Sequence, residues 1–182
     1  MGKGIWKALM IGTLLAATVG CSATRTQQSA GEVIDDSVLT AKVKTALIDD
    51  PVTKAGQINV ETYRGVVQLG GFVDTAEQKQ RATAVARAVT GVKEVRNDLR
   101  VSAQQATAGQ AIDDTTLTAS VKARLVEDSA ENATKINVET QNGVVQLTGF
   151  VDSSEAKTRA GQLARNVDGV RDVRNDLEIR QR

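Results

Sequence analysis

The sequence predicts an α+β protein made of two tandem α-β-β-α-β domains, each with two helices on one face of a three-stranded mixed sheet. The main observation is a repeat. Residues 34–101 (copy one) recur as residues 112–179 (copy two) without a gap, and 39 of the 68 aligned positions are identical. In both copies the spacing of apolar residues changes from helical to alternating and back in the same order. A repeat of this length that occurs twice indicates two similar domains, because solenoid units are shorter and more numerous.

The first helix of each copy is predicted by apolar residues at helical spacing, which in copy one are Leu39, Val43 and Leu47. Asp35, Asp36 and Ser37 precede them, and short polar side chains of this kind accept the unpaired N–H groups of a first helical turn. Copy two repeats the pattern after residues 113–115. The helix should end near Pro51 in copy one and near Ser129 in copy two.

Two short strands follow, at 58–62 and 66–69 in copy one, and side chains alternate between apolar and polar in the first of them. In copy two the equivalent strands are separated by Gln141-Asn142-Gly143, and Asn-Gly between such segments is the strongest short signal for a hairpin. Glycine is present in the turn of both copies, at Gly65 and Gly143. We expect both at positive φ, which glycine adopts without steric penalty.

A second helix and a last strand complete each copy. Asp74 and Glu77 are spaced as a capping box with Asp in the cap position, and helical spacing then continues to Gly91, a typical helix-ending residue. The last strand is expected at 95–101, and copy two repeats these features up to residue 179. A right-handed crossover through the second helix would place this strand beside the hairpin.

Residues 1–20 predict a lipoprotein signal peptide. Lys3 and Lys7 precede a short apolar run that ends in small residues, and this arrangement is typical of secretory signals. The run is too short to span a bilayer, which requires about 20 apolar residues.

Cys21 follows this run and is the one cysteine of the chain, so no internal disulfide can form. Thr18-Val19-Gly20-Cys21 resembles the lipobox of bacterial lipoproteins, which implies cleavage before Cys21 and its acylation by fatty acids such as palmitate. Residues 21–33 are then predicted to be a lipidated flexible tether, and the similarly polar residues 102–111 to be a linker.

The two copies resemble the BON domain (bacterial OsmY and nodulation). The resemblance rests on 66–74 (VVQLGGFVD) and 91–99 (GVKEVRNDL) in copy one, and on the matching segments of copy two. With the lipobox and the tether, the chain resembles a dual-BON outer-membrane lipoprotein, with BON domains at 34–101 and 112–182. The resemblance implies a non-enzymatic protein, lipid-anchored at the periplasmic face of the outer membrane, which binds phospholipid surfaces and supports envelope integrity or osmotic-stress tolerance.

A second function stays open beside lipid binding: an adaptor that binds envelope proteins and touches lipid only through Cys21. Nucleic acid is not an expected partner. Copy one carries 10 basic and 9 acidic residues, and copy two carries 8 and 12, so neither has the basic excess that nucleic-acid binding requires.

The sequence offers little material for catalysis. It contains no histidine, and its single cysteine is the predicted acylation site, so the usual general base and most transition-metal sites are excluded. Paired aspartates such as Asp49-Asp50 are explained by helix ends. We therefore expect no enzyme activity, no metal and no cofactor.

Positions that differ between the copies are the candidates for copy-specific contacts. Pro51 and Val52 of copy one stand where copy two has Ser129 and Ala130, and they suit shallow membrane insertion. Tyr63 and Arg64 replace Gln141 and Asn142 at the hairpin. We take Pro51, Val52, Tyr63 and Arg64 as the candidate membrane or partner contacts. Residues kept in both copies are interpreted as structural: Phe72 and Phe150 as core anchors, and Asn59, Asn97 and their equivalents as hydrogen-bond donors to nearby backbone.

Overall fold

The computed structural model describes residues 35–53, 58–102, 108–128 and 136–180. The predicted signal peptide, Cys21 and the tether lie outside the described residues. Both repeats belong to one compact unit, which spans residues 31–182.

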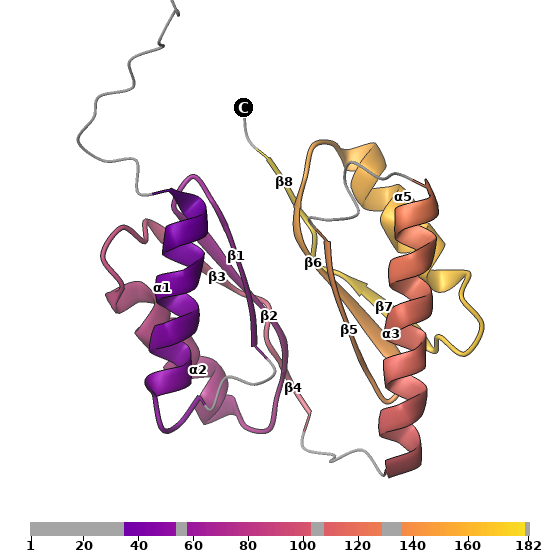
Figure 1. Ribbon diagram of the computed structural model, residues 1–182, viewed down its shortest axis with the longest axis horizontal. Helices are drawn as coiled ribbons and strands as arrows, with labels where there is room; N and C mark the ends of the chain where they lie inside the picture. The colour runs from indigo at the N-terminus through magenta and orange to yellow at the C-terminus, as the bar shows by residue number, and fades with distance from the viewer. Residues whose placement is uncertain (1–34, 54–57, 103–107, 129–135, 181–182) are drawn as a thin grey trace, which may run out of the picture. The chain divides into compact units, whose positions relative to one another are not determined.

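The first repeat has the predicted element order, and both of its helices cover the same face of its sheet (Figure 1). Its elements are α1 (Asp36–Asp49), β1 (Ile58–Tyr63), β2 (Val66–Val73), α2 (Ala76–Ala88), β3 (Glu94–Asn97) and β4 (Arg100–Val101). The α+β fold class predicted from the sequence is confirmed.

The second repeat has the same order. Its elements are α3 (Ala108–Asp128), β5 (Ile136–Gln141), β6 (Val144–Val151), α5 (Ser154–Arg165), β7 (Asp172–Asn175) and β8 (Glu178–Ile179). The helix α3 begins inside the predicted linker, so a helix start at 113–115 was wrong. Asp114 has another role there, because its carboxylate accepts the backbone N–H groups of Asn142 at 2.7 Å and Gly143 at 2.8 Å.

The central strand of each sheet, β2 or β6, pairs antiparallel with the hairpin strand before it and parallel with the last strand. This last strand was predicted as continuous but is broken into two pieces, β3 and β4 in the first repeat and β7 and β8 in the second. In the first repeat the break falls at Asp98 and Leu99. The Asp98 N–H still bonds the carbonyl of Leu69 at 2.8 Å, and Leu99 is fully buried, so the break keeps the sheet intact.

Each repeat has its own core beneath its helices. In the first repeat α1 contributes the predicted stripe of Leu39, Val43 and Leu47, and α2 contributes Ala82 and Ala86. Alanines at the contact let α2 approach the sheet closely, and the larger side chains of the strands fill the remaining space. The second repeat repeats this arrangement, with Val121 and Leu125 on α3 and Ala160 and Ala164 on α5.

Helix α1 starts as predicted, because Asp35 is its N-cap and accepts the Ser37 N–H at 3.0 Å. The cap of α2 is Thr75 and not Asp74. Its hydroxyl accepts the N–H of Gln78, whose side chain accepts the Thr75 N–H in return. The capping box is therefore shifted by one residue, because Thr-x-x-Gln fits the same geometry as Asp-x-x-Glu.

The hairpin turn of the first repeat has two successive residues at positive φ, Arg64 at 51° and Gly65 at 82°. The second repeat is the same at Asn142 and Gly143, so the prediction for both glycines is confirmed. Asp36 fixes the turn to α1, since its carboxylate accepts the N–H of Arg64 at 2.6 Å and of Gly65 at 2.9 Å. Thus the turn that carries Tyr63 and Arg64 is held at the N-terminal end of α1.

Candidate functional site

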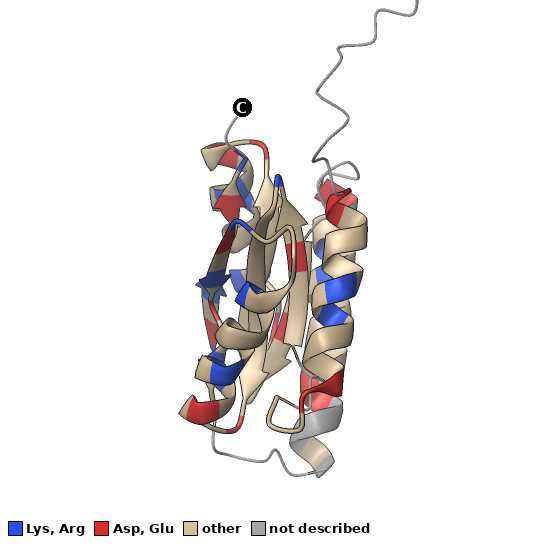
Figure 2. Ribbon diagram, turned by 90° about the vertical axis from the view of Figure 1, so that its left-hand side faces the viewer, with Lys and Arg blue, Asp and Glu red and all other residues tan. Residues whose placement is uncertain are grey.

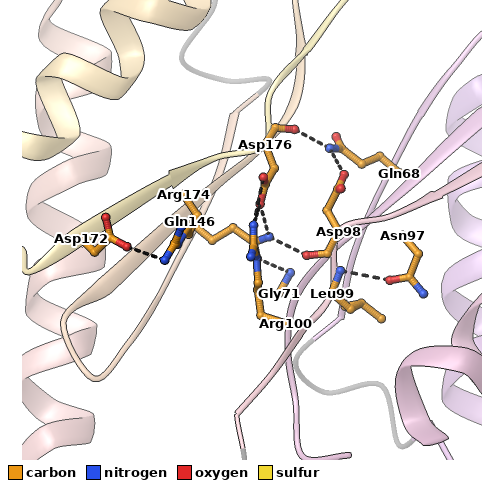
Figure 3. Close-up of polar contacts among 10 residues, drawn as sticks. All are labelled: Gln68, Gly71, Asn97, Asp98, Leu99, Arg100, Gln146, Asp172, Arg174 and Asp176. Carbon is orange, nitrogen blue, oxygen red and sulfur yellow. Dashed lines mark hydrogen bonds and ion pairs between the residues drawn. The ribbon is translucent and has the colours of Figure 1, made fainter. Parts of the chain in front are cut away.

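The two repeats contact each other through their sheets, on strands β1, β2, β5 and β6. The centre of this contact is a polar cluster that we call the glutamine lock. It comprises Gln68, Gly71 and Asp98 of the first repeat and Gln146, Gly149 and Asp176 of the second. Figure 3 shows all of these residues except Gly149. Members of each set occupy equivalent positions, so the lock has approximate two-fold symmetry.

Gln68 lies in β2 and is 1% exposed. Its Nε2 group donates to Asp98 Oδ2 at 2.7 Å and to the Asp176 carbonyl at 2.6 Å, while its Oε1 accepts the Gly149 N–H at 2.8 Å. Burying an amide is unfavourable unless its donors and acceptor are all bonded. Gln68 meets this condition only because the second repeat supplies two of its three partners.

Gln146 makes the equivalent set of bonds. Its Nε2 group donates to Asp176 Oδ2 at 2.8 Å and to the Asp98 carbonyl at 2.7 Å, and its Oε1 accepts the Gly71 N–H at 2.8 Å. Gly71 has a φ of 113°, which other residues rarely adopt. This backbone conformation accompanies the Gly71 N–H bond to the other repeat.

A second symmetric pair of bonds flanks the lock. Asn59 Nδ2 donates to Glu139 Oε1 at 3.0 Å, and Asn137 Nδ2 donates to Glu61 Oε1 at 2.8 Å. The expectation that these asparagines bond nearby backbone was therefore wrong, since their partners are side chains of the other repeat. It was right for Asn97, whose Nδ2 donates to the Lys79 carbonyl at 2.7 Å.

Charges around the lock break its symmetry. Arg100 donates to the Asp176 carboxylate, with Nη2 3.2 Å from Oδ2. The residue equivalent to Arg100 is Glu178, which is an acid and instead pairs with Arg96 at 2.8 Å. Burial raises the pKa of the Asp98 carboxyl, and the neighbouring Asp176 and Glu178 raise it further, although the bond from Gln68 opposes this. The fold thus makes the charged form of Asp98 less favourable than it is in water.

Tyr63 lies at the edge of the same contact and is half-buried. Its ring centroid is 5.5 Å from that of Phe150, a residue of the other repeat, and the ring planes are inclined by 37°. The guanidinium groups of Arg64 and Arg180 lie 5.5 Å and 5.6 Å from its centroid, within reach of cation–π attraction. Tyr63, one of the four predicted contact residues, therefore takes part in joining the repeats through Phe150 and Arg180.

Pro51 and Val52 lie in the turn after α1, where Pro51 is exposed and Val52 is half-buried. Asp50 holds this turn, because its Oδ1 accepts the N–H groups of Val52 and Thr53 at 3.0 Å and 3.1 Å. Arg81 of α2 lies 2.7 Å from Asp50 Oδ2 and lowers the pKa of that carboxyl. The turn therefore has a fixed shape, and the Asp50 charge is balanced.

Ile48 lies beside this turn and is 67% exposed. It was not among the contact residues predicted from the sequence, although its position supplies a signal: it follows Leu47 and so falls outside the buried stripe of α1. We call Ile48, Pro51 and Val52 the apolar tip.

The structure does not bring the four predicted contact residues together. The apolar tip lies at the C-terminal end of α1, whereas the turn with Tyr63 and Arg64 is held at its N-terminal end by Asp36. A helix of the 14 residues in α1 is about 21 Å long. Pro51 and Val52 therefore belong to a different surface from Tyr63 and Arg64.

Charge and metal-ligand clusters give no other candidate site in the described part of the chain. In the view of Figure 2, Lys and Arg are interspersed with Asp and Glu along the helices, and no continuous basic face is seen. Within the described ranges no group of three acidic, histidine or cysteine side chains is placed to hold a metal ion. No described helix has the length and apolar character needed to cross a membrane.

Comparison with known proteins gives consistent matches. A family model described as BON domain matches residues 35–103 and 113–181. The chain is 42% identical over 151 residues to osmotically-inducible protein Y of Escherichia coli K12, covering 82% of this chain and 75% of that protein. It is 37% identical over 172 residues to outer membrane lipoprotein DolP of Haemophilus influenzae, covering 94% and 86%. It is also 35% identical over 147 residues to a 21 kDa hemolysin of Actinobacillus pleuropneumoniae, covering 80% and 75%.

Replacing Gln68 by leucine should lower the free energy of unfolding by about 2–4 kcal/mol, because it leaves the Gly149 N–H and the Asp176 carbonyl buried without partners. Chemical denaturation followed by circular dichroism measures this change. Gln80→Leu is the matched control, since Gln80 is exposed on α2 and the same substitution there should change stability by less than about 0.5 kcal/mol. Equal effects of the two substitutions would contradict the role given to the lock.

Asp98→Asn and Asp176→Asn should shift stability in opposite directions at pH 7. The folded chain raises the pKa of Asp98, so its contribution to stability is most favourable at acidic pH and declines as the pH rises through that pKa. The Asp98→Asn substitution keeps an acceptor for Gln68 and removes the unfavourable charge, so it should stabilise the chain and flatten its pH profile above about pH 4, the ordinary pKa of this carboxyl. The Asp176→Asn substitution loses the ion pair with Arg100 and should cost about 0.5–1 kcal/mol. Thermal melts across this pH range distinguish the two.

Proposed function

The chain belongs to the BON-domain family, and from that premise we propose that it is a non-enzymatic, lipid-anchored envelope protein whose paired repeats contact phospholipid surfaces. Relatives support the envelope assignment, because one is an outer membrane lipoprotein and another is osmotically inducible. In this proposal Cys21 carries the anchor at the outer membrane, the repeats face the periplasm, and the protein supports envelope integrity under osmotic stress.

The apolar tip of the first repeat is the observation that carries the lipid-binding proposal. The open sheet faces of the two repeats cover each other at the glutamine lock. Helices and loops are therefore the surfaces left for membrane contact. The tip presents Ile48 and Pro51 to solvent on a turn fixed by Asp50. Lys44 lies one helical turn before Ile48 and is exposed, so a cation for lipid phosphates lies on the same side of the helix.

The second repeat offers a less suitable surface at the equivalent position. Val126 replaces Ile48 and is 53% exposed, and Glu127 and Asp128 follow it. Arg159 contacts Asp128 at 2.6 Å, as Arg81 contacts Asp50 in the first repeat. Because copy two has no apolar pair equivalent to Pro51 and Val52, we assign the membrane contact to the first repeat.

Residues 22–182 should float with phospholipid liposomes at low salt. Ile48→Ser combined with Val52→Ser should weaken the affinity for liposomes about tenfold, since it removes apolar area worth about 1.5 kcal/mol from the contact. Val126→Ser is the matched control in the second repeat and should float like the unchanged chain, and circular dichroism checks that all variants are folded. Absence of flotation by the unchanged chain would favour the protein-binding adaptor.

Cys21→Ser should release the full-length protein from the membrane fraction, because the thiol that takes the lipid is absent. Fractionation of cells that express each form, with immunoblotting, measures the shift. Several buried acyl chains give an anchor of many kcal/mol, at about 0.8 kcal/mol for each buried CH₂, so the change should be nearly complete. Full membrane retention of the Ser variant would count against acylation without affecting the assignment of the apolar tip.

A further inference from the structure

Three positions that differ between the repeats lie in the contact between them. They are Gly70, Arg100 and Tyr63 of the first repeat, where the second repeat has Thr148, Glu178 and Gln141. The glutamine lock around them is the same in both repeats and would fit any pairing of the two. The differing positions therefore decide which pairings are allowed.

Gly70 and Thr148 are equivalent positions that face each other. A Cβ atom added at Gly70 would lie 2.5 Å from Cγ2 and 2.6 Å from Oγ1 of Thr148, closer than atoms can pack. Thr148 is itself buried, with 3% of its surface exposed. Two threonines would overlap at this place and two glycines would leave a void, so one glycine and one threonine fit best.

The charges at the contact also favour the observed pairing over a pairing of two second repeats. Arg100 meets Asp176 of the other repeat with 3.2 Å between the charged atoms. If two second repeats paired with the same geometry, Glu178 would take the place of Arg100 and the ion pair with Asp176 would be lost. Glu178 pairs across the contact with Arg96 at 2.8 Å, and Arg174 is the equivalent of Arg96, so this pairing keeps that bond but lacks the one made by Arg100.

The aromatic contact also depends on a residue that only the first repeat has, Tyr63. Tyr63 packs on Phe150 and is flanked by Arg180, which Asp152 holds at 2.8 Å. A pairing of two second repeats would place Gln141 opposite Phe150 and lose the ring contact. Shape, charge and ring packing therefore oppose the same wrong pairing independently.

We propose that the helix-free sheet face of the second repeat is a docking surface specific for a BON repeat with glycine at position 70 and arginine at position 100. Its occupant is the first repeat of the same chain, and a second copy of this protein can supply that repeat in trans. The second repeat rejects another copy of itself. The pairing is thus encoded in the faces and does not depend on the linker, and the inference is independent of lipid binding.

A chain that is cut after folding tests whether the linker is needed. A protease site placed within residues 103–107 of the mature protein allows cleavage of the folded chain. The two halves should remain together in a 1:1 complex on size-exclusion chromatography with light scattering. Separation of the halves at micromolar concentration would overturn the proposal.

A shape exchange tests the specificity in the same cleaved protein. Gly70→Thr should weaken the association of the halves about 10- to 100-fold, since overpacking costs about 1–3 kcal/mol. Gly70→Thr with Thr148→Gly restores one glycine and one threonine and should bring the affinity back to within about tenfold of the unchanged protein. If the single variant fails to fold, recovery in the double variant still decides the question. A double variant no tighter than Gly70→Thr alone would contradict shape matching.

A charge removal and a capture assay complete the test. Arg100→Gln should weaken association about two- to fivefold, because it removes the ion pair with Asp176. Cleaved chains with a tag on the second repeat are mixed with cleaved untagged chains in mild denaturant and then returned to buffer. The tagged half should capture untagged first repeats and not untagged second repeats. Equal capture of both halves would overturn the selectivity.

Discussion

Two amide side chains buried between the sheets, Gln68 and Gln146, constrain much of the remaining structure. Each requires one donor and two acceptors inside the contact, because water is excluded there. The glycine at 71 or 149 supplies the N–H group, and the break in the last strand gives both the carboxylate and the carbonyl of Asp98 or Asp176. The positive φ of these glycines and the broken strand thus serve the contact between repeats as well as the fold of each repeat.

This constraint determines where a ligand can bind. A single repeat of this type has a helix-covered face and an open sheet face, but here the open faces satisfy each other. Surfaces at helix ends and loops are left for a membrane or a partner. Ile48 and Pro51 are exposed at such an end, and Asp50 fixes their turn by accepting two backbone N–H groups. An anchor at Cys21 would raise the local concentration of this small apolar surface, so a weak affinity for lipid would be sufficient.

The repeat predicted the architecture of each domain closely, because helix spacing, strand alternation and turn glycines are local features. The errors made from the sequence differ in origin. Thr75 and Gln78 form a capping box one residue away from Asp74 and Glu77, and both pairs have the required spacing. Helix α3 starts at Ala108, inside the predicted linker, although Asp114 binds its hairpin as Asp36 does in the first repeat. Asn59 carries an obvious polar signal, but its partner Glu139 is 80 residues away, and no local pattern identifies such a partner.

The sequence by itself determined the two-domain α+β organisation, the helix stripes, the hairpin glycines and the membership of the BON family. It also indicated that positions differing between the copies carry specific roles. Only the tertiary structure decided what those roles are. Tyr63, which the sequence suggests as a membrane contact, packs on Phe150, and Gly70 is small because Thr148 occupies the space opposite. The physical reason is that complementarity belongs to pairs of residues brought together by folding, whereas a sequence pattern describes each residue among its chain neighbours.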